Sequence, residues 1–367
     1  MQRCARYRSR SGAHATHSYR GFDKMLFLLL LLMSAVTCVP TPLVLHISPN
    51  AAPSASAAHA TLLRDGFLHL PELIPADEAL AWGRAVDAAA NARAADCSAS
   101  ALGRKCEPSP PPGAPASFLR ARDLAATDAG LAVLTHSPAL ARVVASALRV
   151  KGLRYYESSA FIKHSGDERS RWHSDAAAIP LRTDKIATLW LSLSDVDADA
   201  GALKFLNASH LPGVPRPSLR DVPVFERPLV MAEWADATDA AVRAATGLDV
   251  VRARAMRAGD ATLHLGWTLH AASRNKSPHD RVALAITYFV DGARIDDVLE
   301  SQRSGEGDAR GGIRFSGDGG SDLIVHLLAD DVSTWTPWIH ERVLIPGTRM
   351  EHERLTPLLF GGKLGDL

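Results

Sequence analysis

The stretch Phe161-Ile-Lys-His-Ser-Gly-Asp-Glu-Arg-Ser-Arg-Trp-His-Ser-Asp175 combines an apolar run, a turn and a His-x-Asp pair. In an extended segment, residues i and i+2 point to the same side, so His173 and Asp175 can approach one metal ion while Ser174 points away. A second histidine, His270, follows Asp175 by 95 residues in a Trp-Thr-Leu-His sequence. Two imidazoles and one carboxylate are the smallest protein set that holds Fe(II) on one face and leaves the other positions open. The sequence therefore predicts a metal and catalytic centre of His173, Asp175 and His270.

The types of donor also limit the choice of metal. Imidazole and carboxylate favour Fe(II), Mn or Zn over Cu(I) or an iron–sulfur cluster. Two of the four cysteines lie near the N-terminus, and the other two, Cys97 and Cys106, do not have the spacing of metal ligands. In an oxidising compartment, Cys97 and Cys106 could close one disulfide across a short loop.

The segments around the His-x-Asp pair have the pattern of strands. Ile186 to Ser194 alternates as a half-buried strand does, Gly259 to His270 is typical of a turn and a strand, and Arg281 to Phe289 is typical of another strand. Strand-like segments cluster between residues 153 and 290, and Ala-rich, helix-like segments occupy about 76–95, 121–150 and 235–247. This arrangement predicts a mainly β fold, a double-stranded β-helix (jelly roll, cupin-like) with helices outside one sheet.

Four blocks of the sequence carry a resemblance to a known family. They are Leu62 to Leu80, Phe161 to Asp175, Trp190 to His210, and His270 to Phe289. Over most of residues 60–360, the chain resembles the phytanoyl-CoA dioxygenase-like (PhyH) family of Fe(II)- and 2-oxoglutarate-dependent oxygenases. The resemblance implies that the three predicted ligands bind Fe(II), that 2-oxoglutarate and O2 are cosubstrates, and that ascorbate is an optional reductant.

The resemblance also implies a binding site for the cosubstrate. Arg281 takes the place of the arginine that pairs with the distal carboxylate of 2-oxoglutarate, a task that suits a planar, permanently charged fork. The alternative is that Arg281 caps a strand or pairs with Asp280 in solvent. Trp190 fits a pocket wall as well as core packing, and Lys163 is a weaker candidate for contact with the ligand. The polar residue expected two places after His270 is an alanine here, and Ser273 stands one place later.

One further histidine competes for the role of the distal ligand. His264 lies six residues before His270 and has the same parity along the strand. The Gly-Trp-x-x-His context and the spacing to the arginine favour His270 over His264.

The activity implied is hydroxylation of a small or lipid-like organic substrate with release of succinate and CO2. Two alternatives remain open: a zinc-dependent hydrolase, which would need a general base, and a non-catalytic jelly-roll binding protein. The balance of 41 basic and 40 acidic residues indicates no affinity for nucleic acid. The sequence does not indicate the oligomeric state or the substrate.

The N-terminal region has the architecture of a signal peptide. An apolar run from Met25 follows a basic, acid-poor stretch, and prolines at 40 and 42 end it too early for a membrane span. We expect residues 1–60 to be a targeting segment with a linker, cleaved near Ala57 or Ala60, and residues 61–360 to be the catalytic domain. The segment predicts entry into the secretory pathway, to the ER lumen, the exterior or an organelle reached through it, with an uncleaved signal anchor as the alternative. Residues 300–322 have a loop composition that suits a lid.

Overall fold

The structure is a computed structural model. It describes residues 43–48, 53–99, 118–126, 128–179, 181–213, 237–295, 348–351, 353 and 356–361. The chain divides into two compact units, residues 1–42 and 43–367, and every described residue belongs to the second. The apolar run from Met25, Cys106 and the predicted lid at 300–322 lie outside the described residues.

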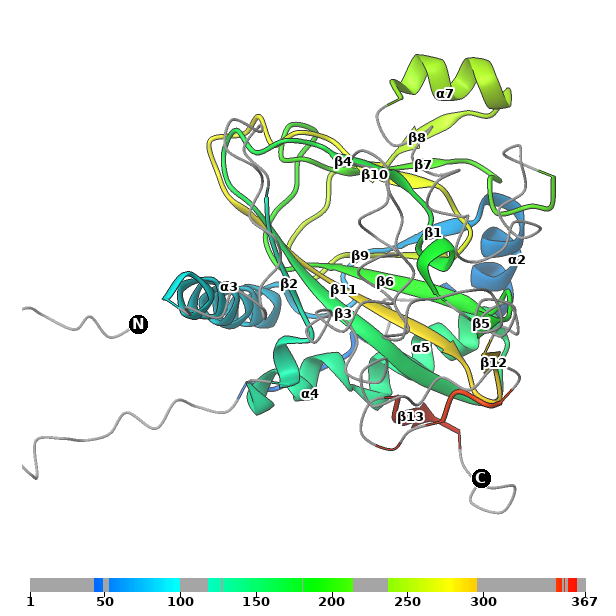
Figure 1. Cartoon of the computed structure of the whole chain (residues 1–367), viewed down its shortest axis with the longest axis horizontal. Helices are drawn as coiled ribbons and strands as arrows, with labels where there is room; N and C mark the ends of the chain where they lie inside the picture. Colours follow the sequence, from blue (N-terminus) through cyan, green and yellow to red (C-terminus); the bar gives the residue numbers. More distant parts are fainter. Residues whose placement is uncertain are drawn as a thin grey trace, which may run out of the picture. The chain divides into compact units, whose positions relative to one another are not determined.

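Two antiparallel sheets form the body of this unit (Figure 1). The major sheet has the order β1-β9-β6-β11-β3-β13, with β2 also paired to β3, and the minor sheet has the order β4-β10-β7-β8. A short ladder pairs β12 with β5. The strands are β1 Phe67–Leu70, β2 Leu119–Arg122, β3 Leu153–Lys163, β4 Ser170–His173, β5 Leu181–Arg182, β6 Ile186–Ser192, β7 Leu203–Leu206, β8 Val250–Arg252, β9 Ala261–Leu265, β10 His270–Ala272, β11 Arg281–Val290, β12 Arg294–Ile295 and β13 Leu358–Phe360. The predicted double-stranded β fold is confirmed.

The central strands of the major sheet are buried on both faces. Every residue of β6 is buried, and so are eight of the ten residues of β11. Leu189 and Ile286 belong to a core shared with the helices, whereas Trp190 and Ala285 belong to a second core shared with the minor sheet. Because successive side chains of a strand point to opposite faces, a single run of apolar residues serves both cores.

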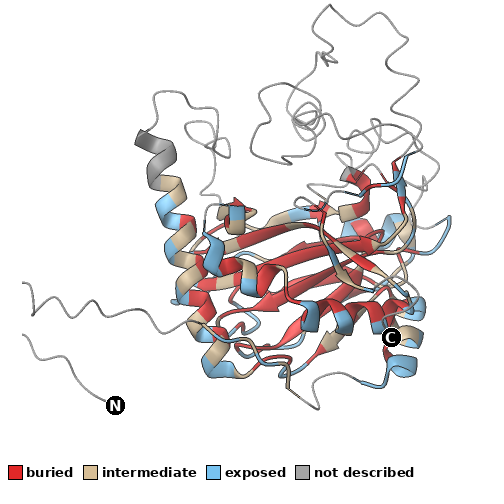
Figure 2. Ribbon diagram, turned by 90° about the horizontal axis from the view of Figure 1, so that it is seen from below, coloured by how far each residue is buried: buried red, intermediate tan, exposed pale blue. Residues whose placement is uncertain are grey.

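Helices cover the face of the major sheet that is turned away from the minor sheet. They are α2 Ala55–Asp65, α3 Ala76–Ala99, α4 Ala132–Thr135 and α5 Pro138–Leu148, while α7 Asp239–Thr246 lies beside the minor sheet. In Figure 2 the strands are buried along their length, and the helices expose their outer sides. Residues of α3 and α5, among them Trp82 and Val144, share the core with β6 and β11. This layer leaves the other face of the major sheet for a site.

The helix expected over residues 121–150 is wrong in its first half. Residues 119–122 form strand β2, which pairs with β3, and short 3-10 turns and α4 follow. The helix α5 begins only at Pro138, where the hydroxyl of Ser137 accepts a hydrogen bond from the N–H of Leu140. Proline fits the first turn of a helix but not its interior, so the residue that restarts the helix also prevents a continuous one.

Helix α2 crosses the boundary predicted at residue 60. Ala58 and Leu62 of this helix are buried in the main core, and the ring Nδ1 of His59 contacts the carbonyl oxygen of Ala147 at 2.9 Å. The first strand, β1, starts only at Phe67, after Gly66 ends α2 with a φ of 86°. Residues 55–60 are therefore part of the packed fold in this structure.

One helical stretch of the described residues, Ala129–Leu148, is long and apolar enough to cross a membrane by length and composition. Of its most apolar window, 56% is buried. Leu140 and Val144 of this stretch belong to the main core. Packing inside the domain accounts for its apolar character.

Candidate metal centre

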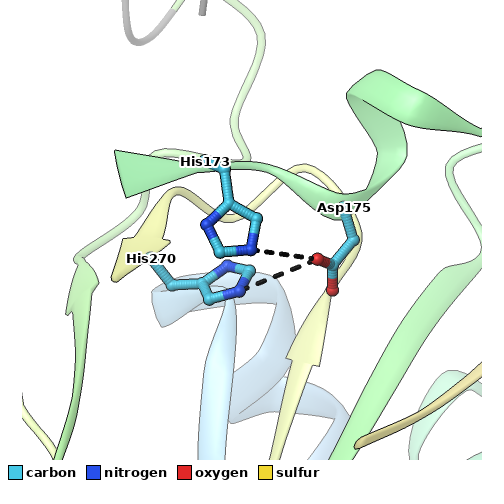
Figure 3. Close-up of side chains that lie close together, drawn as sticks. All are labelled: His173, Asp175 and His270. Carbon is cyan, nitrogen blue, oxygen red and sulfur yellow. Dashed lines mark ion pairs between the residues drawn. The ribbon is translucent and has the colours of Figure 1, made fainter. Parts of the chain in front are cut away.

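The two predicted histidine ligands lie opposite each other on neighbouring strands. His173 is the last residue of β4, His270 is the first residue of β10, and they are partners in the antiparallel register. Their ring centroids are 4.1 Å apart. Figure 3 shows both rings turned toward the carboxylate of Asp175. The pairing of β4 with β10 thus brings together two residues that are 97 positions apart in the sequence.

Asp175 lies just beyond the end of β4, as the first residue of the 3-10 helix η3 Asp175–Ala178. Ser174 points away, as expected, and its hydroxyl donates a hydrogen bond to the carbonyl oxygen of Gly266 at 2.8 Å. The prediction that His173 and Asp175 face the same space is confirmed, although Asp175 is not itself in a strand. Its orientation therefore depends on more than strand alternation.

The donor atoms surround a space of the size of a metal ion. One ligand atom from each of His173, Asp175 and His270 lies within 4.8 Å of the others. The Oδ1 atom of Asp175 is 3.6 Å from Nε2 of His173 and 3.7 Å from Nε2 of His270. Ligands that each bind one ion at about 2.1 Å lie roughly 3 to 4 Å apart, so these distances fit an ion between them.

Backbone contacts hold each imidazole with the same nitrogen toward the site. The Nδ1 atom of His173 is 2.9 Å from the carbonyl oxygen of Arg171, and Nδ1 of His270 is 3.1 Å from that of Thr268. A carbonyl accepts, so Nδ1 carries the proton and Nε2 presents its lone pair to the space. Both rings are oriented as metal ligands.

Electrostatics favour the metal-binding protonation states. Burial raises the pKa of Asp175, but the neighbouring imidazole of His270 and the hydrogen bond from His264 outweigh this and hold the pKa well below its usual range. Burial lowers the pKa of His270 well below its usual value. An ionised carboxylate and two neutral imidazoles are the forms that bind a divalent cation.

Access to the centre is uneven within the part of the chain that the structure describes. The side chain of His173 is 46% exposed, that of Asp175 is 20% exposed and that of His270 is 7% exposed. The centre is thus open on the side of His173 and closed by the sheets on the side of His270. The three donors leave the other coordination positions of an ion to small molecules.

Two further side chains hold the second oxygen of the carboxylate. Asp175 Oδ2 accepts a hydrogen bond from the hydroxyl of Thr188 at 2.6 Å and lies 3.1 Å from Nε2 of His264. The sequence indicates His264 only as a competitor of His270 for the metal, and it gives no role to Thr188. Because His264 and His270 are an even number of residues apart, the sequence does indicate that His264 faces the site. Its hydrogen bond to Asp175 could not be predicted, because that contact depends on how the strands pair.

Arg281 is buried on the face of the major sheet that also carries Thr188 and Trp190. Its residue is 1% exposed, one guanidinium nitrogen donates to the carbonyl oxygen of Gly201 at 2.9 Å, and its carbon Cζ lies 5.2 Å from the ring centre of Trp190. Its Nε is buried without a hydrogen-bond partner among the described residues. Burial lowers the pKa of Arg281 to about 10.

A carboxylate ligand would match this arginine. Asp280, which was the alternative partner, instead forms an ion pair with His164 at 3.0 Å. Within the described ranges, no ion pair to Arg281 is found. A buried guanidinium with an unused donor is costly unless an anion compensates it.

The distance from the arginine to the metal centre follows from strand β6. Thr188 contacts Asp175, and Trp190, two residues further on the same face, packs against Arg281. Alternate residues of a strand are roughly 7 Å apart. A small molecule with a carboxylate at one end and metal-binding oxygens at the other is the kind of ligand that could span this interval.

Lys163 and Ser273 lie near one another, but only the lysine faces the arginine. Lys163 is fully buried opposite Arg281 in the ladder of β3 and β11, and its ammonium donates to the carbonyl oxygen of Ser273 at 2.8 Å. Burial, with the nearby charge of Arg281, lowers the pKa of Lys163 to about 7. The hydroxyl of Ser273 instead accepts a hydrogen bond from Arg252 at 3.3 Å.

Comparisons with known proteins agree with this fold. Two solved structures share the fold over 83% of this chain and 98% of their own: the non-heme alpha ketoglutarate dependent carbocyclase SnoK (19% identity, TM-score 0.56) and epimerase SnoN (20% identity, TM-score 0.54), both from nogalamycin biosynthesis. SnoN has also been solved with Fe3+, alpha ketoglutarate and nogalamycin RO (21% identity, TM-score 0.54). No curated protein sequence matches the chain. The profile described as Phytanoyl-CoA dioxygenase (PhyH) matches residues 62–283, and the chain belongs to this family.

Proposed function

We propose that this protein hydroxylates a small or lipid-like organic substrate and converts 2-oxoglutarate and O2 to succinate and CO2. Membership of the family and the His173, Asp175 and His270 donor set establish the broader class, a non-haem Fe(II)- and 2-oxoglutarate-dependent oxygenase. The observation that carries the proposal is a buried arginine on the same sheet face as this centre: Arg281 of β11 packs against Trp190, which lies two residues along β6 from Thr188, the residue that contacts Asp175.

Each side chain has a defined task in this proposal. His173, Asp175 and His270 hold the metal, which supplies the oxygen chemistry when bound. Arg281 binds the distal carboxylate of 2-oxoglutarate, and Trp190 forms the wall that keeps the guanidinium in place. Burial of Arg281 and His270 excludes water from the inner side, so the substrate approaches from the exposed side of His173.

Lys163 and Ser273 have less direct roles. Lys163 adds a second buried basic side chain on the face that receives the cosubstrate. Ser273 contributes through its backbone carbonyl, which accepts the hydrogen bond from the lysine. We propose that this contact keeps the ammonium beside the anion site, with the serine hydroxyl free of the cosubstrate.

The experiment is a 2-oxoglutarate turnover assay with a panel of substrates. Protein loaded with Fe(II) without oxygen and then exposed to O2 should release succinate, more strongly with a true substrate and with ascorbate present. A product that is heavier than the substrate by one oxygen atom supports hydroxylation. An isomerised or cyclised product would show that the enzyme catalyses a different reaction of the substrate. Asp175→Ala should release no succinate. Turnover by zinc-loaded protein without 2-oxoglutarate would instead support the hydrolase.

We propose in addition that the N-terminal segment directs the chain into the secretory pathway. The basic stretch and the apolar run from Met25 support this proposal. A fluorescent protein fused after residue 42 should enter the ER lumen in cells, and a cytosolic signal would overturn the proposal.

A further inference from the structure

Only one oxygen of the Asp175 carboxylate, Oδ2, accepts hydrogen bonds from side chains among the described residues. Its Oδ2 atom lies 2.6 Å from the hydroxyl of Thr188 and 3.1 Å from Nε2 of His264, while its Oδ1 atom faces the two ligand imidazoles. A carboxylate oxygen only accepts, so both contacts require donors, and His264 must carry its proton on Nε2. The two oxygens of one carboxylate thus have different partners.

These two donors belong to one row that crosses the major sheet. Thr188 of β6 is the direct partner of His264 on β9 and of Thr287 on β11. The hydroxyls of Thr188 and Thr287 are 3.0 Å apart, and both residues are buried. Because a threonine hydroxyl has one proton, donation to Asp175 requires Thr188 to accept from Thr287. The row is therefore a directed chain of hydrogen bonds that ends on Asp175.

We propose that His264 and Thr188 are positioning residues that hold Asp175 with a single oxygen, Oδ1, toward the metal. Asp175 needs such support because it begins a 3-10 helix beyond the end of β4 and no strand pairing fixes it. A carboxylate that turned would present both oxygens and occupy a position that the cosubstrate and O2 need. This inference rests on the proposed function, because it assigns the support of that metal centre.

The surroundings of His264 fit this role. The side chain of His264 is 2% exposed, and its ring lies 4.4 Å from the ring of His270 and 5.5 Å from that of Phe205. Its Nδ1 has no hydrogen-bond partner among the described residues. With the proton on Nε2, Nδ1 is a bare acceptor and no buried N–H is left unpaired. In the part of the chain that the structure describes, the one hydrogen bond of the ring goes to Asp175.

Matched substitutions distinguish the effect of losing a hydrogen-bond donor from the effect of changing the side-chain volume at His264 and Thr188. His264→Gln keeps an N–H near the position of Nε2, whereas His264→Asn moves it to the position of Nδ1, out of reach of Asp175. Thr188→Ser keeps the hydroxyl, and Thr188→Val removes it at nearly constant volume. Thr262→Val is the control, since this buried hydroxyl on β9 has no hydrogen-bond partner among the described residues.

The test is titration of the metal-free variants with Co(II), followed by visible absorption of the bound ion. Loss of an outer-shell partner typically lowers metal affinity about 10- to 100-fold, and we expect this loss for His264→Asn and Thr188→Val, with altered Co(II) absorption bands. We expect His264→Gln, Thr188→Ser and Thr262→Val to bind within about threefold of the wild type and to keep its spectrum. Thermal unfolding of each metal-free variant shows whether it is folded.

Asp175→Ala distinguishes the two levels of the proposal. If Asp175→Ala binds Co(II) as tightly as the wild type, the metal centre and the proposed function are both wrong. If Asp175→Ala loses binding while His264→Asn and Thr188→Val match the wild type in affinity and spectrum, only the positioning role is overturned. If His264→Asn or Thr188→Val does not fold, the conservative variants His264→Gln and Thr188→Ser decide the question. Weaker Co(II) binding by either of these folded variants than by the wild type would also overturn the positioning role.

Discussion

At the scale of single residues, the site consists of groups that are buried in the forms in which they act. The pKa of Asp175 is held well below its usual range, burial lowers the pKa of His270, and the pKa of Arg281, about 10, still favours the cation although the residue is almost inaccessible. Each state has a nearby cause: the surrounding imidazoles, burial in the sheet, or a carbonyl and an aromatic ring. The centre is thus organised for binding before a ligand arrives.

Arg281→Gln should weaken binding of 2-oxoglutarate without affecting binding of the metal. The substitution removes a charged hydrogen bond worth about 1.5–3 kcal/mol, so we expect the affinity for 2-oxoglutarate to fall roughly 10- to 100-fold. Calorimetric titration of Co(II)-loaded protein with 2-oxoglutarate measures this change. Arg64→Gln, at a side chain that is 70% exposed, serves as the control. An unchanged affinity in Arg281→Gln would remove the arginine from the cosubstrate site.

Asp123 should make stability depend on pH away from the metal centre. Burial, with the charge of Glu157, raises the pKa of Asp123 from 3.8 to about 6, although Tyr155 donates a hydrogen bond to it at 2.5 Å. A raised carboxyl pKa means that the folded state binds the proton more tightly. Its contribution to stability is therefore full below pH 3.8 and is lost as the pH rises to about 6.

Asp123→Asn should accordingly stabilise the protein more at pH 7.5 than at pH 4. Asparagine can still accept from Tyr155 and carries no charge to desolvate, and the gain relative to the wild type should grow by about 2 kcal/mol across this range. Urea unfolding of both proteins at the two pH values measures it. A difference between the two proteins that does not change with pH would contradict the shifted pKa.

At the scale of elements, residues 43–48 and helix α2 are part of the fold. Trp82 of α3 donates a hydrogen bond from its ring nitrogen to the carbonyl oxygen of Val44 at 3.2 Å, and Leu43, Leu45 and Ile47 pack against the main core. Helix α2 continues this layer through Ala58 and Leu62. Residues that have the composition of a linker therefore cover the helical side of the major sheet.

Removal of residues 1–60 should destabilise the protein much more than removal of residues 1–42. The longer deletion exposes apolar surface, and each side chain that loses its burial costs about 1.5–3 kcal/mol. Thermal unfolding of the two shortened chains, compared with the full chain, measures the difference. Equal melting temperatures would show that α2 does not contribute. Because Ala58 and Leu62 are packed in the core, we expect N-terminal sequencing of a cleaved chain to place the cut before Leu43, and not near Ala57 or Ala60 as the sequence predicts.

At the scale of the whole described domain, the metal centre joins two sheets. His173 and His270 belong to the minor sheet, while the residues that hold Asp175 belong to β6 and β9 of the major sheet. A ligand that binds all three donors therefore links the two layers. It also binds only the folded state, in which these distant parts of the chain are assembled.

Metal should raise the melting temperature, and a chelator should reverse the effect. At a Co(II) concentration of about 100 times the dissociation constant, binding adds about 2.7 kcal/mol to the free energy of unfolding. Differential scanning calorimetry with and without Co(II) measures the shift. Asp175→Ala should show almost none, and a similar shift in that variant would mean that Co(II) binds elsewhere.

The family resemblance pointed to Arg281, and the residues alone predicted the strand cluster between residues 153 and 290 and the donors of the candidate metal centre, His173, Asp175 and His270. The strand cluster and the donors follow from alternation along single strands and from the chemistry of a few residue types, both of which are local. The sequence also predicted a helix over 121–150, which the structure breaks, because β2 pairs with β3 at the start of this range and Pro138 starts a new helix within it.

Only the tertiary structure decided how the site is supported. Alternation shows that His264, Thr188 and Thr287 face the interior, but not that they form one row, since that depends on the register of three strands from distant parts of the chain. It likewise decided that the hydroxyl of Ser273 turns to Arg252 and that residues 55–60 are helical. Contacts between segments remote in sequence depend on how sheets pair and pack, which no local pattern encodes.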